Sequence, residues 1–217
     1  MPILRPDLEY IIHCESDGTI IGPISKIHAH LSGVKRTLTH YGTWGMVFHQ
    51  VLGKYGIQLK NSAKYGVPKW DMGVGGHNPY IIRNGQYEPL GFADNLIKEA
   101  DEEIGLNLKI CDRLEDFLVT SQKLGQWAVG FVFEKFHYQT EFCDEFIGLG
   151  IILTPHTKVE FKDNEVIDFK WLTPNELEEF LNGNNQCCAP LILAFEKTEK
   201  FRLKYLNKKY ELINLVI

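Results

Sequence analysis

Three glutamates in one short stretch carry the clearest chemical signal of this sequence. Glu99, Glu102 and Glu103 are spaced i, i+3 and i+4, so on a helix their carboxylates line one face. Such like charges destabilise an isolated helix by a few tenths of a kcal/mol per pair. A divalent cation reverses that cost, and Mg²⁺ prefers carboxylate oxygens and bridges them to substrate phosphates. A solvated acidic helix face is the alternative interpretation.

The elements that would position these carboxylates are a glycine turn and a helix. The pattern predicts a helix over about 93–104, which Gly105 ends. A short apolar run stops at Gly75-Gly76, where bare backbone can approach a ligand. Between the two, residues 78–91 contain two prolines and two glycines, which predicts a loop.

The remaining pattern mixes strands with a few separated helices. This favours an α/β sandwich over a doubly wound parallel sheet. We expect a first hairpin with its turn at Asp17-Gly18 and a second with its turn at Gly53. A Thr173-Pro174-x-Glu176 helix start is also expected. The expected strands cover 8–14, 19–21, 44–50, 55–60, 114–121, 127–138, 148–153 and 166–171, and a last helix covers 189–205.

Composition narrows the class of protein. The chain has 217 residues, 44% of them hydrophobic, and a net charge of −5. Interspersed charges of this balance disfavour nucleic acid polymers as partners. Since no run approaches ~18 apolar residues and no signal-peptide pattern is present, we expect a cytoplasmic protein with no membrane partner. The five scattered cysteines favour free thiols in a reducing compartment: Cys14, Cys111, Cys143, Cys187 and Cys188.

Histidine spacing argues against zinc. His28 and His30 share a side if that stretch is extended, but no clear third ligand follows them. Structural zinc sites take four ligands. The sequence therefore disfavours a zinc site here.

The residues from Lys98 to Leu106, Lys-Glu-Ala-Asp-Glu-Glu-Ile-Gly-Leu, resemble the second half of the Nudix box, Arg-Glu-U-x-Glu-Glu-x-Gly-U with U apolar. Gly75-Gly76 resembles its opening glycines. The resemblance implies a Nudix-type α/β/α sandwich with a mixed sheet. It divides the chain into an N-terminal extension with a strand hairpin (1–35), a Nudix hydrolase domain (36–185) and a C-terminal helical extension (186–217).

Two Nudix groups share finer features with this chain. The run from Trp70-Asp71 to Gly76-His77 resembles Nudix proteins close to isopentenyl diphosphate isomerase. The stretches 90–99 and 163–169 resemble a group related to the diphosphatase linked to thiamine pyrophosphokinase.

The box departs from its standard form, Gly-x5-Glu-x7-Arg, in its first half. Gly76 and Lys98 lie eight residues further apart than that spacing allows, and Lys98 replaces the arginine. Leu90 stands where the first glutamate would fall. In the family that first pair orients the loop, so the departure concerns loop geometry more than the metal ligands.

By resemblance, Glu99, Glu102 and Glu103 bind Mg²⁺, with Mn²⁺ as the alternative ion, assisted by the backbone carbonyl of Gly76. Glu103 or Glu102 accepts the proton of the attacking water, and Glu165 in the late acidic motif is the other candidate.

Two further residues have open roles. Lys98 orients the helix or contacts phosphate. His77 makes a structural hydrogen bond or contacts substrate.

The resemblance implies hydrolysis of a diphosphate linkage in a small organic substrate, with a thiamine-diphosphate-like compound expected first. The alternative substrate is a nucleoside diphosphate derivative of the ADP-ribose or nucleotide-sugar type. A ligand sensor without catalysis is the rival class, and a homodimer is compatible with the family. Isomerase activity is disfavoured, because that enzyme needs a cysteine just upstream of Trp70-Asp71, and none occurs between Cys14 and Cys111.

Overall fold

The computed structural model describes residues 5, 7–30, 38–61, 67–83, 85–123, 127–141, 143–162 and 165–207. The structural statements below concern these residues. The first two residues of the late acidic motif, Asp163 and Asn164, lie outside them.

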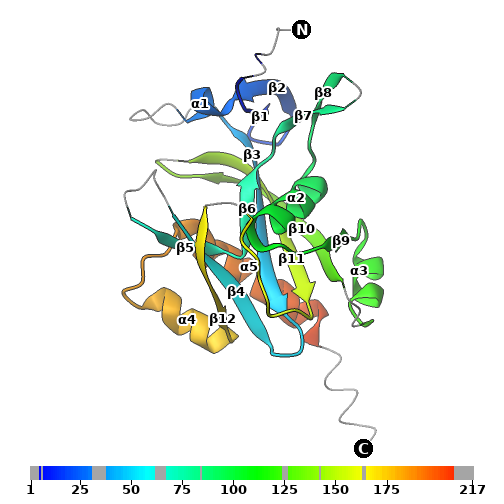
Figure 1. The fold of residues 1–217 in the computed structure, drawn as a ribbon, viewed down its shortest axis with the longest axis vertical. Helices are drawn as coiled ribbons and strands as arrows, with labels where there is room; N and C mark the ends of the chain where they lie inside the picture. Colours follow the sequence, from blue (N-terminus) through cyan, green and yellow to red (C-terminus); the bar gives the residue numbers. More distant parts are fainter. Residues whose placement is uncertain are drawn as a thin grey trace, which may run out of the picture.

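Twelve labelled strands and five helices follow one another along the described chain (Figure 1). The strands are β1 (Tyr10–Cys14), β2 (Ile20–Ser25), β3 (His40–His49), β4 (Lys54–Lys60), β5 (Lys69–Met72), β6 (Val74–His77), β7 (Tyr80–Arg83), β8 (Gln86–Pro89), β9 (Leu108–Ile110), β10 (Ala128–Gln139), β11 (Asp144–Thr154) and β12 (Val166–Leu172). The helices are α1 (Lys26–Ala29), α2 (Phe92–Ile104), α3 (Leu114–Thr120), α4 (Pro174–Asn182) and α5 (Ala189–Tyr205).

One mixed sheet forms the centre of the molecule. Its strand order is β12-β4-β3-β11-β10-β9, with β5 added on β4, β6 on β3, and β1 on β3 and β2. β11 pairs with β3 in parallel, whereas β3 and β4 form an antiparallel hairpin. Parallel and antiparallel pairs together make the sheet mixed, as predicted.

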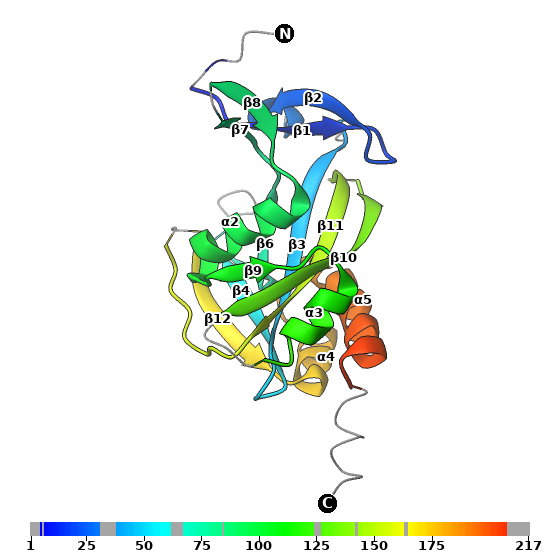
Figure 2. The same ribbon diagram turned by 90° about the vertical axis from the view of Figure 1, so that its right-hand side faces the viewer.

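Helices cover both faces of this sheet, α2 on one side and α3, α4 and α5 on the other (Figure 2). Strand alternation separates the two cores. On β3, Val47 packs with Leu96 of α2, while its neighbour Met46 packs with Phe195 of α5. The α/β/α sandwich predicted from the sequence is confirmed.

The helix ends agree with their predicted signals. Gly105 caps α2 in the left-handed conformation, at φ 67°. At the start of α4, the Thr173 side chain accepts a bond from the Glu176 backbone N–H, and Glu176 returns one to Thr173. This reciprocal capping box satisfies two donors that a helix start otherwise leaves unpaired.

The strand expected over 114–121 is wrong, because this segment forms α3. Leu114, Phe117 and Leu118 stand at i, i+3 and i+4, a helical spacing that places their side chains on one face. Phe117 is fully buried in the core beneath α5. Burial of this face therefore outweighs the strand preference of the short apolar run.

The stretch 78–91, expected to be a loop, contains a hairpin. β7 and β8 pair with each other in a small separate sheet, and Gly85 lies in the turn with φ 77°. Its prolines sit at the margins, one before β7 and one at the end of β8, where they remove no essential ladder bond. The hairpin lies beside β1 and β2 at one end of the molecule (Figures 1 and 2).

Two elements fall in the segments predicted as extensions. The β1–β2 hairpin lies in 1–35, and β1 pairs with β3 at His13 and His40. α5 lies in 186–217 and packs on the central sheet. The division of the chain into a domain with two extensions stays a prediction. None of the described helices is both long enough and apolar enough to cross a bilayer.

Candidate active site

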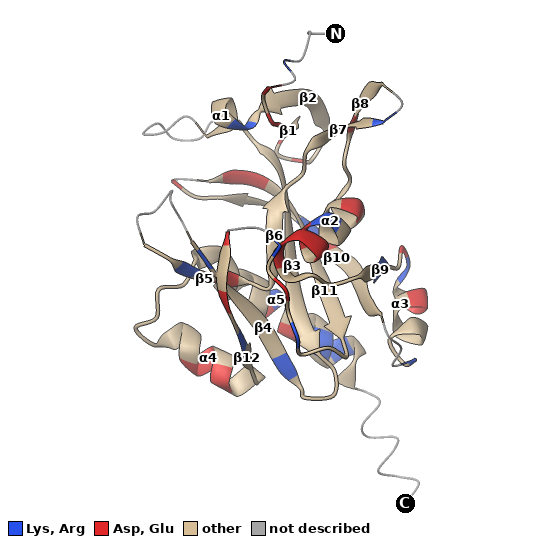
Figure 3. Ribbon diagram, in the orientation of Figure 1, with Lys and Arg blue, Asp and Glu red and all other residues tan. Residues whose placement is uncertain are grey.

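The predicted carboxylates lie where α2 passes β6, and an acidic run is visible along that helix (Figure 3). Glu103 and Glu99 are buried, while the side chain of Glu102 is 49% exposed. The Gly75 backbone N–H donates to Glu103 Oε2 at 2.8 Å. The glycine turn and the glutamate helix, remote in sequence, are therefore in direct contact.

Gly76 lies against the Glu99 carboxylate so closely that a larger residue would displace the end of the Glu99 side chain. A Cβ at this position would come within 2.5 Å of Glu99 Oε1, well inside van der Waals contact. Asn95 Nδ2 lies 3.5 Å from the Gly76 carbonyl oxygen. The bare backbone thus brings a carbonyl and a carboxylate to the same place.

Lys60, at the end of β4, was not identified from the sequence. Its ammonium lies 2.5 Å from Glu103 Oε1 and donates to the Gly75 carbonyl at 2.7 Å. Gln58, two residues earlier on the same strand face, donates to Glu103 Oε2 at 3.2 Å. The two-residue period of the predicted strand is the one signal that could have placed both side chains together.

Lys98 pairs with the other two glutamates. Its ammonium donates to Glu99 Oε1 at 3.1 Å and to Glu102 Oε2 at 2.6 Å. Two lysines therefore share the three carboxylates, one buried beneath β6 and one at the surface.

Burial is the largest cause of the pKa shifts of Glu103 and Glu99. It raises the pKa of Glu103 to about 7, although the Lys60 ammonium acts in the opposite direction. It also raises the pKa of Glu99, again against the charge of Lys98. Burial acts to lower the pKa of Lys60, but the charges of Glu103, Asp71 and Glu165 outweigh it and the pKa is raised.

Glu165 stands beside this site. Its backbone carbonyl accepts from the Asn61 N–H at 2.6 Å, and the next residue, Val166, pairs with Lys60 across the strands. Its charge reaches the Lys60 ammonium. The late acidic motif is thus brought to the glutamate cluster by the pairing of β12 with β4.

His77 points away from the glutamates into a cluster with His30 and His40. One ring nitrogen of each lies within 4.8 Å of the others. His28 and His30 do not lie on an extended segment, because α1 is helical and His30 follows it as the cap. His28 is not part of the cluster, and the two histidines that join His30 come from β3 and β6.

Glu145 of β11 adjoins this cluster. Its Oε1 lies 3.6 Å from His40 Nε2 and 3.7 Å from His77 Nε2. Burial acts to raise the pKa of Glu145, but the neighbouring imidazoles hold it well below its usual value.

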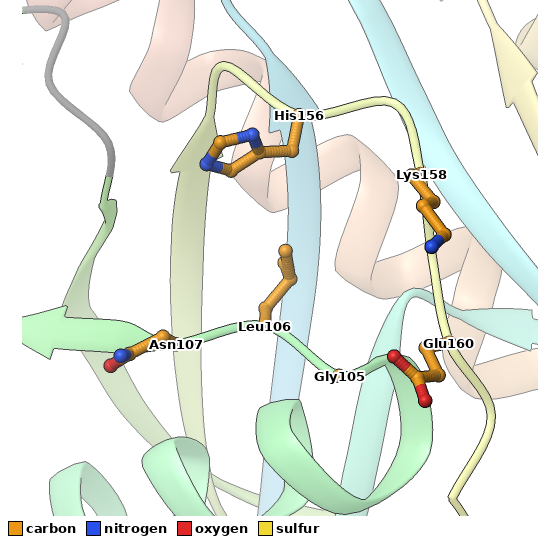
Figure 4. Close-up of a pocket in the computed structure, with 6 residues that line it drawn as sticks. All are labelled: Gly105, Leu106, Asn107, His156, Lys158 and Glu160. Carbon is orange, nitrogen blue, oxygen red and sulfur yellow. The ribbon is translucent and has the colours of Figure 1, made fainter.

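A separate surface pocket of about 260 Å³ lies at the end of α2 (Figure 4). It is lined by Gly105, Leu106, Asn107, His156, Lys158 and Glu160. None of the predicted site residues lines it.

The donor chemistry of the glutamate site fits a hard divalent cation. Three carboxylates and the Gly76 carbonyl offer oxygen alone, the donor set that Mg²⁺ and Mn²⁺ prefer. Among the described residues, three side chains with possible metal-ligand atoms converge within 4.8 Å: His30, His40 and His77. The glutamates do not form such a group of three. The glutamates are held by lysines instead, so a cation there would compete with an ammonium.

Comparison with known proteins gives a fold. No family model matches this chain, and no curated protein matches it. A crystal structure of DR0079 from Deinococcus radiodurans is similar over 87% of this chain and 98% of its own, with a TM-score of 0.58 and 13% identity. At this identity the likeness establishes a shared fold.

Two further solved structures show a weaker likeness. The MutT protein from Methanosarcina mazei Go1 has 12% identity and a TM-score of 0.48, with 75% of this chain and 94% of that chain covered. A Nudix family hydrolase from Clostridium perfringens has 17% identity and a TM-score of 0.46, with 74% of this chain and 97% of that chain covered.

Proposed function

We propose that this chain is a Nudix hydrolase that cleaves the diphosphate linkage of a small organic substrate with the help of Mg²⁺ or Mn²⁺. The observation that carries the proposal is the contact of Gly75-Gly76 with Glu99 and Glu103. These are the two halves of the box-like motif, and they meet although the segment between them is eight residues longer than the standard spacing.

The proposed cation site consists of Glu99, Glu102, Glu103 and the Gly76 carbonyl. When bound, the cation would neutralise the diphosphate and lower the pKa of a water molecule. The protein's own part is to hold the ligands: Gly75 N–H and Gln58 orient the Glu103 carboxylate, and the missing Cβ of Gly76 lets Glu99 approach.

Among the candidate bases, Glu102 is the one we favour for accepting the water's proton. The Glu103 oxygens already accept from Gly75, Gln58 and Lys60. Glu102 is the most exposed of the three, and it pairs with the partly exposed Lys98. Glu165 remains the alternative base, since it lies within the electrostatic reach of Lys60.

Lys98 is placed to exchange partners. Its side chain is 37% exposed, so its ammonium can leave the glutamates and meet a substrate phosphate without crossing the core. This keeps the proposed phosphate contact of Lys98 compatible with its bonds to Glu99 and Glu102. For His77, its place among histidines favours the structural role over the substrate contact.

For the substrate we propose a thiamine-diphosphate-like compound, with nucleoside diphosphate derivatives such as ADP-ribose or a nucleotide sugar as the second class. The first rests on the resemblance of the sequence stretches 90–99 and 163–169 to the diphosphatase group. A small-molecule partner and a homodimer are proposed on the same family grounds, and a cytoplasmic location is proposed from the sequence pattern.

The test is turnover on a panel of thiamine diphosphate, ADP-ribose, a dinucleoside polyphosphate and a nucleotide sugar, with Mg²⁺ or Mn²⁺. We expect one member to release phosphate or a mononucleotide. Glu102→Gln should lower that rate by roughly a hundredfold or more. Glu115→Gln, on exposed α3, is the matched control and should leave it unchanged. No turnover on any member, with the panel still binding, would favour the ligand sensor.

A further inference from the structure

The histidine cluster brings together four ligand groups from four parts of the chain. His30 caps α1, His40 begins β3, His77 ends β6, and Glu145 lies near the start of β11. The His30 and His77 rings are edge to face with centroids 4.6 Å apart, and His40 lies 4.9 Å from His77.

The ring nitrogens that face each other are all Nε2. His30 Nε2 and His77 Nε2 are 3.2 Å apart. Glu145 Oε1 lies 3.6 Å from His40 Nε2 and 3.7 Å from His77 Nε2. Three imidazole nitrogens and one carboxylate oxygen therefore border one small volume.

The opposite ring nitrogens are anchored by backbone. His40 Nδ1 donates to the Leu38 carbonyl at 3.1 Å, and His30 Nδ1 donates to the Lys26 carbonyl at 2.7 Å. A proton on Nδ1 leaves the lone pair on Nε2 in a neutral imidazole. Histidines that bind metals usually donate their second N–H in this way, which fixes the tautomer and the ring orientation.

An independent observation points to a ligand. The His40 side chain is fully buried, yet its Nε2 has no hydrogen-bond partner. A buried polar atom without a partner destabilises the folded protein. A bound cation would satisfy this atom, which hydrogen bonding within the protein leaves unpaired.

We propose that His30, His40, His77 and Glu145 bind a divalent transition metal, with Zn²⁺ expected first, at a site separate from the glutamate site. Three imidazoles and one carboxylate supply the four ligands of tetrahedral zinc. Imidazole also suits Cu²⁺, Ni²⁺ and Fe²⁺, whereas Mg²⁺ prefers oxygen. Cys143 supports the carboxylate from outside, since its thiol donates to Glu145 Oε1 at 2.8 Å.

The position of the site indicates a structural role. His30 belongs to the N-terminal segment, while His77 and Glu145 belong to the central sheet. A metal shared by them would fasten α1 to the sheet. It would also restrain His77, the residue next to Gly76, whose carbonyl is a proposed ligand of the other cation.

Metal content and cobalt spectra test the proposal. The full chain is stripped with a chelator, reloaded with Zn²⁺ or Co²⁺ in millimolar Mg²⁺, and its bound metal measured per chain. We expect one retained Zn²⁺, and for Co²⁺ the intense visible bands of four-coordinate geometry. His30→Ala should weaken Zn²⁺ binding by more than about a hundredfold, since loss of an outer partner alone costs 10–100-fold.

Two control variants test whether a loss of Zn²⁺ binding is specific to this site. His28→Ala changes an exposed histidine of the same helix and should bind Zn²⁺ as the wild type does. Glu102→Gln should also retain the Zn²⁺ and the cobalt spectrum. His30 is half-buried, so its variant is expected to fold, which circular dichroism checks. If His30→Ala misfolds, the cobalt spectrum of the wild type decides alone.

Two results would overturn the proposal. One is wild-type protein that binds neither metal in the presence of Mg²⁺. The other is His30→Ala binding Zn²⁺ as tightly as His28→Ala.

Discussion

The glutamate cluster and the histidine cluster border the same strand, β6, and differ in how the chain treats their charge. Gly75 and Gly76 touch the glutamates, and the next residue, His77, belongs to the histidines. At the glutamates, the chain places an ammonium on every carboxylate. At the histidines, backbone carbonyls hold the Nδ1 atoms of two rings, so their Nε2 atoms face the interior of the cluster.

Two neighbouring sites can therefore suit different cations, because their donor atoms differ and because only one of them already has ammonium groups beside its donors. Carboxylates that already hold exchangeable lysines suit a hard cation that arrives with its substrate. Oriented imidazoles suit a transition metal that stays.

Replacing Lys60 should have the largest effect on stability. In Lys60→Met the buried Glu103 loses its ammonium, and we expect a loss of about 3 kcal/mol, near the lower end for a broken buried pair. The lower end applies because burial already brings the pKa of Glu103 to about 7, so this carboxyl can take up a proton instead. Denaturant unfolding without metal measures the change, and Mg²⁺ should stabilise the variant more than the wild type.

Metal selectivity should separate the two clusters. At a hundred times its dissociation constant, a cation stabilises the folded protein by about 2.7 kcal/mol. His40→Ala should lose this gain for Zn²⁺ and keep the gain for Mg²⁺, and Glu102→Gln should do the reverse. Thermal unfolding with each metal measures both. One variant abolishing both gains would show that the clusters form a single site.

A methyl group at Gly76 should damage the contact between β6 and α2. In Gly76→Ala the new Cβ overlaps the Glu99 carboxylate, the end of a flexible side chain that can turn aside, so we expect a stability loss of about 1 kcal/mol, the lower end for overpacking. Hydrolysis should fall together with stability. Gly91→Ala is the comparison, because its Cβ meets nothing within 4 Å; equal losses in both variants would contradict the close approach.

The surface lysine should contribute least. Lys98→Met removes its exposed pair with Glu102 and its pair with the more buried Glu99, and pairs near the surface contribute about 1 kcal/mol or less. Its stability should therefore stay near that of the wild type, in contrast to Lys60→Met. A loss as large as that of Lys60→Met would contradict the division into a buried and a surface lysine.

Local patterns predicted the helix that carries the three glutamates. The spacing of Glu99, Glu102 and Glu103 and the stop at Gly105 are properties of one helix, so the sequence shows them directly. The short stretch 114–121 was misassigned because its apolar run fits either period, and only burial beneath α5 decides it.

Sites that form only when distant strands pair could not be predicted from local sequence patterns. His30, His40, His77 and Glu145 come together because β3 pairs with β6 on one side and β11 on the other. Lys60 reaches Glu103 across a sheet and a helix in the same way. No spacing along the chain encodes these contacts, since each depends on which strands become neighbours.

The β7–β8 hairpin is a place where the chain can tolerate an insertion. Asn78 closes its base: the side chain donates to the Leu90 carbonyl at 3.0 Å and accepts from the Thr43 hydroxyl at 2.8 Å. Doubling the length of a closed loop costs only about 0.6 kcal/mol. The turn at Gly85 is therefore a position where an affinity tag, a fluorophore or a whole domain can be inserted without moving β6 and α2 on either side.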